Sequence, residues 1–133
     1  MSTLTLNWQG ELKFAGGPDG PPIALDSSTS NVLSPTQALA YAVMGCMAMD
    51  VVHMLQKGQH AVQALSVRFE STRAPDHPRR LTSVHLHFDI TGDLPDAAVT
   101  RAIELSRTRF CSVSNSLRQD IDFTTTFVVH AAG

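Results

Sequence analysis

The sequence predicts an α+β fold with the element order β-β-β-α-β-β-α-β. Alternating apolar and polar residues, which are typical of strands, occur in several short segments, and one long uncharged segment between helix-capping residues is typical of a helix. The chain has 133 residues, a net charge of −2 and 43% apolar residues. This length and composition predict one domain over residues 1–133, large enough to form a core without disulfides or metals.

Three short strands are expected near the N-terminus. Residues 4–8 and 12–14 alternate in polarity on both sides of residues 9–10, which predicts a hairpin. Residues 16–22 are rich in glycine and proline and therefore predict a turn. Residues 23–25 can then return as the third strand.

The uncharged segment predicts a buried helix over about residues 35–57. Ser34 is a favourable cap, Pro35 suits the first helical position, and Gly58 suits the end. The continuous apolar stretch, residues 38–49, is too short to cross a bilayer of about 30 Å. A helix that is apolar on nearly every face needs neighbours on nearly every side, so a second subunit is expected to cover part of it.

The second half predicts three more strands and another helix. A turn at residues 74–78 makes the first two strands an antiparallel pair. The expected elements are strands at residues 62–70, 81–90 and 121–129, a helix at residues 95–110, and its continuation after a bend at residues 113–117.

Cys46 and Cys111 are the candidates for chemistry. Gly45 beside Cys46 costs about 1 kcal/mol relative to alanine inside a helix, so another backbone or a substrate is expected to approach there. Cys111 follows Arg107 and Arg109, whose charges favour a thiolate or, alternatively, suit the end of a helix. Both cysteines have the alternative of simple packing, and the sequence leaves open whether they meet.

Two groups of residues have spacings that suit metal ligands. Cys46, Asp50 and His53 share one helix face, but no fourth ligand is evident, and the alternative is that Asp50 and His53 mark where the helix emerges into solvent. His85 and His87 share one face of a strand whose other residues on that face are simply polar. We therefore expect no metal.

The charge distribution argues against two classes of partner. Arginines and lysines are scattered and nearly balanced by acids, so neither nucleic acid nor a membrane surface is an expected partner. The first residues show no basic segment followed by an apolar one, which predicts a cytoplasmic protein without a secretory signal.

Two cysteine motifs resemble those of the OsmC/Ohr family. The first comprises residues 34–39 and 44–46, with Pro35 and Cys46 at the family's spacing, and the second surrounds Cys111 at residues 110–114. The similarity covers about residues 31–117. It implies an OsmC-like fold, with an antiparallel sheet packed on two central helices, and an intertwined homodimer.

The resemblance also implies a function. Cys46 would be the peroxidatic cysteine and Cys111 the resolving cysteine of an antioxidant thiol peroxidase that reduces organic hydroperoxides. An external dithiol, in some family members a lipoylated protein, would reduce the resulting disulfide, and no cofactor would be bound. The alternative is a non-catalytic OsmC-like protein that binds an apolar small ligand or acts as a redox sensor.

Three residues depart from the pattern of the peroxidase branch. Pro18 stands where that branch has an activating arginine, and Thr36 and Gln37 stand where it has a glutamate that orients this arginine. The chain therefore resembles the broader OsmC-like branch more than Ohr proper. An arginine from elsewhere would have to support Cys46, and the candidates are Arg73, Arg79, Arg80, Arg107 and Arg109.

Overall fold

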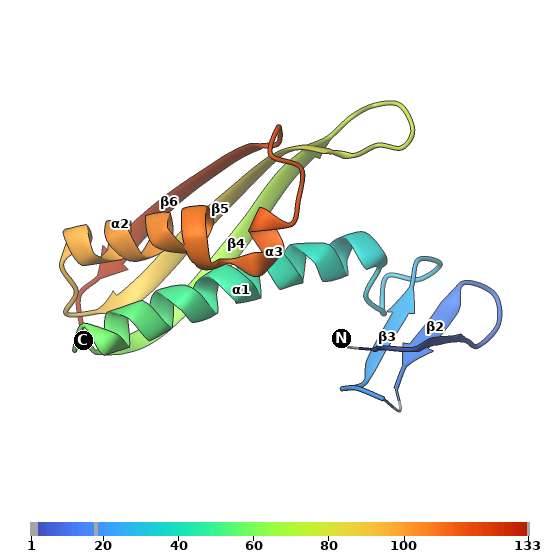
Figure 1. Ribbon diagram of the computed structural model, residues 1–133, viewed down its shortest axis with the longest axis horizontal. Coiled ribbons are helices and arrows are strands. Elements are labelled where there is room, and N and C mark those ends of the chain that lie inside the picture. The colour runs from blue at the N-terminus through green and yellow to red at the C-terminus, as the bar shows by residue number, and fades with distance from the viewer. Residues whose placement is uncertain (1–2, 18, 133) are drawn as a thin grey trace. The chain divides into compact units, whose positions relative to one another are not determined.

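The computed structural model describes residues 3–17 and 19–132, which divide into two units within residues 1–41 and 42–133. The first unit contains an antiparallel sheet with the strand order β1-β2-β3. Its strands are β1 (Leu6–Trp8), β2 (Lys13–Gly16) and β3 (Ile23–Asp26), which confirms the three expected strands and the hairpin (Figure 1). That the whole chain is one domain stays a prediction.

Helix α1 (Pro35–Lys57) begins and ends where the capping residues predict. The backbone N–H of Ser34 donates to Gln37 Oε1 at 3.0 Å, and the backbone N–H of Gln37 donates to Ser34 Oγ at 3.3 Å. This reciprocal pair is a capping box, which satisfies two backbone donors at the start of the helix. At the other end, the Gly58 N–H donates to the Met54 carbonyl at 3.0 Å and closes the last turn.

Only one stripe of α1 is buried within the chain. The stripe has the helical spacing of four residues and consists of Val43, Met47, Val51 and Leu55. On other faces, Tyr41 is 64% and Met49 73% exposed. Much of the apolar surface of this helix is therefore uncovered.

By length and composition alone, α1 meets the criteria for a membrane-spanning helix. Its most apolar 18-residue segment has a mean hydropathy of 1.6, and 22% of that segment is buried. The expectation that this segment is too short counted only residues 38–49, whereas the helix has 23 residues. The buried stripe that packs into the core is also typical of a core helix.

The second unit contains a three-stranded sheet with the order β4-β5-β6. Strands β4 (Val62–Arg73) and β5 (Leu81–Gly92) are antiparallel, as expected, but β6 (Asp122–His130) runs parallel to β5. The expectation of an antiparallel sheet is therefore wrong for this last pair. The helical connection between β5 and β6 returns the chain to the end where β5 began, so the next strand runs in the same direction.

The predicted helix over residues 95–110 consists of two segments. It begins as α2 (Asp96–Leu105) and continues as the π-helical turn η1 (Ser106–Phe110). Cys111 has an extended backbone, and the short helix α3 (Ser112–Asn115) follows it, which confirms the bend and the resumed helix.

The core of the second unit lies between the sheet and the helices. Residues from α1, α2 and one face of β5 form it, and α1 and α2 lie on the same side of the sheet (Figure 1). The fully buried residues of β5 are those expected from the alternation, namely Val84, Leu86, Phe88 and Ile90. This packing brings the middle of α1 against the segment that follows α2, where the second cysteine lies.

Candidate functional site

The packing of the second unit brings Cys46 and Cys111 together. Both are free thiols, and each is close enough to affect the pKa of the other. Cys46 is partly buried in the middle of α1, and Cys111 is completely buried between η1 and α3. The question that the sequence left open is therefore answered, because the two cysteines are neighbours.

The π-helical turn positions Cys111. The Cys111 N–H donates to the Ser106 carbonyl at 2.8 Å and closes this wider turn. On the other side, Cys111 Sγ accepts from the Ser114 N–H at 3.3 Å, and its carbonyl accepts from Asn115 Nδ2 at 2.8 Å. Backbone and sulfur are thus held by η1 and α3, and π-helical turns of this kind are frequent at functional sites.

The surroundings of Cys46 favour its thiolate. Burial raises the pKa of the Cys46 thiol, but the Val113 N–H and the side chains of Cys111 and Ser112 act in the opposite direction and outweigh it. The Cys46 pKa therefore lies below the ordinary value of a thiol. Asp50, one helical turn further on, opposes this effect because its negative charge disfavours a second one.

Cys111 has the opposite character. Burial raises the pKa of its thiol, and the neighbouring Cys46 raises it as well, against the hydrogen bonds from Ser114. The two sulfurs therefore differ, since Cys46 is the one that more readily loses its proton and Cys111 the one that keeps it. A nucleophilic sulfur beside a protonated thiol is an arrangement that can form a disulfide after Cys46 is oxidised.

Ser106 is a site residue that the sequence analysis missed. Its Oγ donates to Asp50 Oδ2 at 2.9 Å, and the serine is completely buried. This bond joins α1, one turn beyond Cys46, to the first residue of the turn that holds Cys111. Asp50 therefore has a partner inside the protein, whereas the sequence suggested either a metal ligand or a solvent-exposed helix end. The sequence signal that could have indicated this partner was an acidic residue within an otherwise apolar helix.

We expect the Cys46 thiolate to form at lower pH than the thiolate of an ordinary cysteine, whose pKa is about 8.5. Because the pKa is lowered, the thiolate fraction increases over a lower pH range as the pH is raised, and the rate of alkylation by iodoacetamide increases with it. Asp50→Asn removes the charge that raises the Cys46 pKa and keeps a side-chain oxygen for Ser106. It should move the alkylation profile of Cys46, followed by peptide mass spectrometry, to still lower pH.

Asp93→Asn, in the exposed turn after β5, is the matched control and should leave this profile in place. Cys111 should react slowly throughout, because it is buried and its pKa is raised. A profile that moves to higher pH in Asp50→Asn, or does not move, would contradict the electrostatic role of Asp50.

The arginines suggested by the sequence are not among the main groups that lower the Cys46 pKa, which are hydrogen-bond donors. Contacts made by four of them lie elsewhere: Arg73 with the Arg79 carbonyl, Arg80 with Asp120, Arg107 with the Phe123 ring, and Arg109 with the Phe110 ring. Gln37, at the position of the family's glutamate, belongs to the capping box of α1. Pro18 lies outside the described residues.

Residues of both groups with metal-ligand spacing have other partners. Cys46 lies against Cys111 and Asp50 binds Ser106, while His85 and His87 pair with Thr124 and Thr126 on β6 at 2.7 Å each. Within residues 3–17 and 19–132, no three histidine, cysteine or acidic side chains are arranged to hold a metal ion.

Comparison with known proteins places this geometry in a family. Residues 28–126 match the family model described as OsmC-like protein. Protein YhfA of Escherichia coli strain K12 is 38% identical over 130 residues, which cover 96% of this chain and 97% of YhfA.

Solved structures share the fold. A hypothetical protein from Aquifex aeolicus VF5 superimposes with a TM-score of 0.92 at 20% identity, over 100% of this chain and 98% of that one. An organic hydroperoxide resistance protein OsmC from Legionella pneumophila gives 0.72 at 17% identity, over 96% and 97% of the two chains. At these identities the likeness concerns the fold alone, but the family match and YhfA show more: the chain belongs to the OsmC-like protein family.

Proposed function

We propose that this protein is a thiol-dependent peroxidase that reduces organic hydroperoxides. The observation that carries the proposal is the contact between two thiols of opposite character, Cys46 with a lowered pKa and Cys111 with a raised one. The family match supports the choice of substrate class, since an organic hydroperoxide resistance protein is among the structures that share this chain's fold.

The proposed reaction proceeds in two steps at these sulfurs. The Cys46 thiolate attacks one peroxide oxygen, the O–O bond breaks, and the alkoxide leaves and takes up a proton as the alcohol. Cys46 is then a sulfenic acid. The Cys111 sulfur attacks it, the S–S bond forms, and the hydroxyl group leaves as water with the proton from Cys111. An external dithiol returns both cysteines to thiols.

The apolar surroundings of Cys46 favour an alkyl hydroperoxide over hydrogen peroxide. Met44 and Cys46 itself pack against the core, and the exposed Tyr41 and Met49 extend the apolar surface of the same helix. The surface of a hydrocarbon substituent is better accommodated there than in water.

A second copy of the chain is proposed to cover this surface. Only one stripe of α1 is buried, and the chain itself does not explain Gly45, since a Cβ added there would meet only Met49 Cε at 4.0 Å. A glycine that costs about 1 kcal/mol in a helix interior is explained if another backbone approaches it. We therefore propose a homodimer with the apolar face of α1 at its interface.

A redox sensor is the second candidate. No arginine is among the main groups that act on Cys46. Without a cation that stabilises the transition state, the rate of peroxide reduction is expected to fall about 100-fold, which favours a sensor. A sensor needs complete oxidation but not fast turnover, and the two functions therefore differ in rate rather than in the bond formed.

Adding one equivalent of cumene hydroperoxide to the reduced protein tests the proposal. We expect both thiols to disappear within seconds, with a loss of about 2 Da in intact mass from disulfide formation. The same product after many minutes would favour the sensor. Two unchanged thiols after an hour would refute both functions, and the apolar surface would then be the place to look for a ligand.

A further inference from the structure

A cavity separate from the cysteines lies between the end of α1 and α2. Its volume is about 310 Å³, at the lower end of the range of about 300–1,000 Å³ that small-molecule sites occupy. Met54 lies eight residues after Cys46, which is about 12 Å along a helix, and neither cysteine lines the cavity. The cavity therefore belongs to a different site from the thiol pair.

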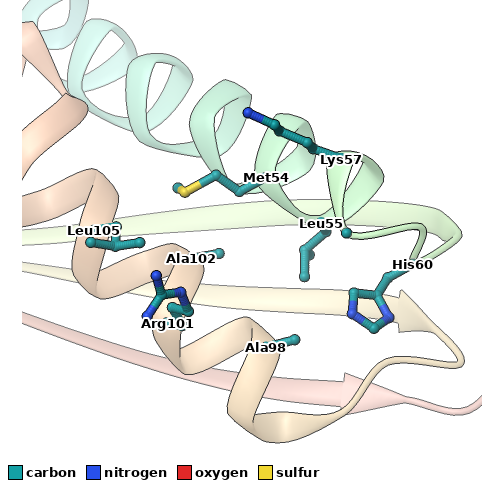
Figure 2. A pocket seen from close by; sticks show the side chains of 9 residues that line it. Met54, Leu55, Lys57, His60, Ala98, Arg101, Ala102 and Leu105 are labelled. Carbon is teal, nitrogen blue, oxygen red and sulfur yellow. The ribbon is translucent and has the colours of Figure 1, made fainter.

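One wall of this cavity is apolar. Leu55 from α1 and Ala98 and Ala102 from α2 face the gap between the two helices (Figure 2), and Met54 and Leu105 extend the wall. The two alanines leave the gap open, because larger side chains at these positions of α2 would fill it. Such a wall suits a short hydrocarbon chain.

The other side chains among the lining residues are basic. Lys57 at the end of α1 and Arg101 on α2 lie on opposite helices, with His60 in the turn between α1 and β4 (Figure 2). No acidic residue is among the lining residues, and in the part of the chain that the structure describes neither Lys57 nor Arg101 forms an ion pair. The Arg101 charge is therefore available to an anion in the gap, whereas the Lys57 ammonium group points away from α2 (Figure 2).

The end of α1 does not oppose such an anion strongly. Helix-terminal carbonyls carry partial negative charge, but here the Met54 and Leu55 carbonyls accept from Gly58 and His60 at 3.0 and 2.9 Å. The turn thereby supplies hydrogen-bond donors to these two carbonyls.

We propose that this cavity binds a small amphipathic carboxylate, with its alkyl chain along the alanine wall and its carboxylate near Arg101. An apolar wall with the Arg101 cation beside it and without lining acids matches both parts of such a molecule. The proposal concerns binding and is independent of peroxide chemistry at Cys46.

Octanoate is the probe, titrated into the full-length reduced protein and followed by amide NMR shifts. We expect saturable shifts at residues 57–60 and along α2. 1-Octanol, which has the same chain length without the charge, should bind about tenfold more weakly, the loss expected for a charge-assisted hydrogen bond. Inorganic phosphate, which lacks the chain, should give no saturable shifts in this region.

Two variants separate the wall from the charge. Arg101→Gln should weaken octanoate binding about tenfold without changing octanol binding, whereas Ala98→Leu should abolish the binding of both by filling the wall. Arg68→Gln, on β4 and paired with Glu70, is the matched control and should bind octanoate as the wild type does.

Three outcomes would overturn the proposal. They are equal binding of octanol and octanoate, unchanged affinity in Arg101→Gln, and shifts that fail to saturate or that fall on the exposed face of α1 instead. The circular dichroism spectrum of each variant checks that its fold is retained.

Discussion

Cys46→Ser is expected to abolish the consumption of organic hydroperoxide, because the serine hydroxyl cannot supply the thiolate that attacks the peroxide. Cys111→Ser should behave differently and consume about one equivalent of peroxide at a rate near that of the wild type. Its sulfenic acid then has no partner sulfur and should react more slowly with a second equivalent of peroxide, with a total gain of about 32 Da for the sulfinic acid. Stopped-flow peroxide consumption and intact mass measure the two effects.

The contrast between these variants is what tests the roles of the two sulfurs. Ser112→Ala keeps both thiols and is the control, with turnover retained and only a small rise of the Cys46 pKa, since Ser112 is one of several groups that lower it. Equal loss of the first turnover in both cysteine variants would contradict the assignment of Cys46 as the attacking sulfur.

Gly45→Leu is expected to weaken the homodimer at least about tenfold, which corresponds to 1.4 kcal/mol of association free energy. The physical reason is steric, because a side chain at this position would separate the two backbones that the proposed interface brings into close contact. Within one chain a Cβ at Gly45 is accommodated, since it meets only Met49 Cε at 4.0 Å. Light scattering across a range of micromolar concentrations measures the effect.

Thr100→Leu, an exposed position on α2, is the matched control and should leave the dimer intact. A wild-type protein that scatters as a folded monomer at micromolar concentration would remove the dimer proposal. So would a Gly45→Leu protein that associates as strongly as the wild type, since nothing would then approach this glycine.

Local sequence signals predicted most of the elements. Ser34, Pro35 and Gly58 marked the two ends of α1, and the alternation in β5 assigned Val84 and its neighbours to the buried face. These predictions succeed because capping and sheet alternation depend on residues that are close in sequence. The similarity of the two cysteine motifs added the family, which the family match over residues 28–126 and the similarity to YhfA confirm.

The relative direction of β5 and β6 was decided only by the tertiary structure. An alternating pattern such as that of β6 is the same in a parallel and an antiparallel strand, so the direction of pairing with β5 was not readable from it. The division of the second helix into α2 and a π-helical turn was likewise not evident, although this turn places Cys111.

The sequence by itself determined which two cysteines are the candidates for chemistry, which helix carries Cys46, and that the surface around it is apolar. Only the tertiary structure decided that Cys111 lies against Cys46, that donors at the start of α3 lower the Cys46 pKa, and that Ser106 binds Asp50. The reason is that these contacts join segments more than fifty residues apart. A pKa depends on neighbours in space, and neighbours in space follow from how the helices pack on the sheet.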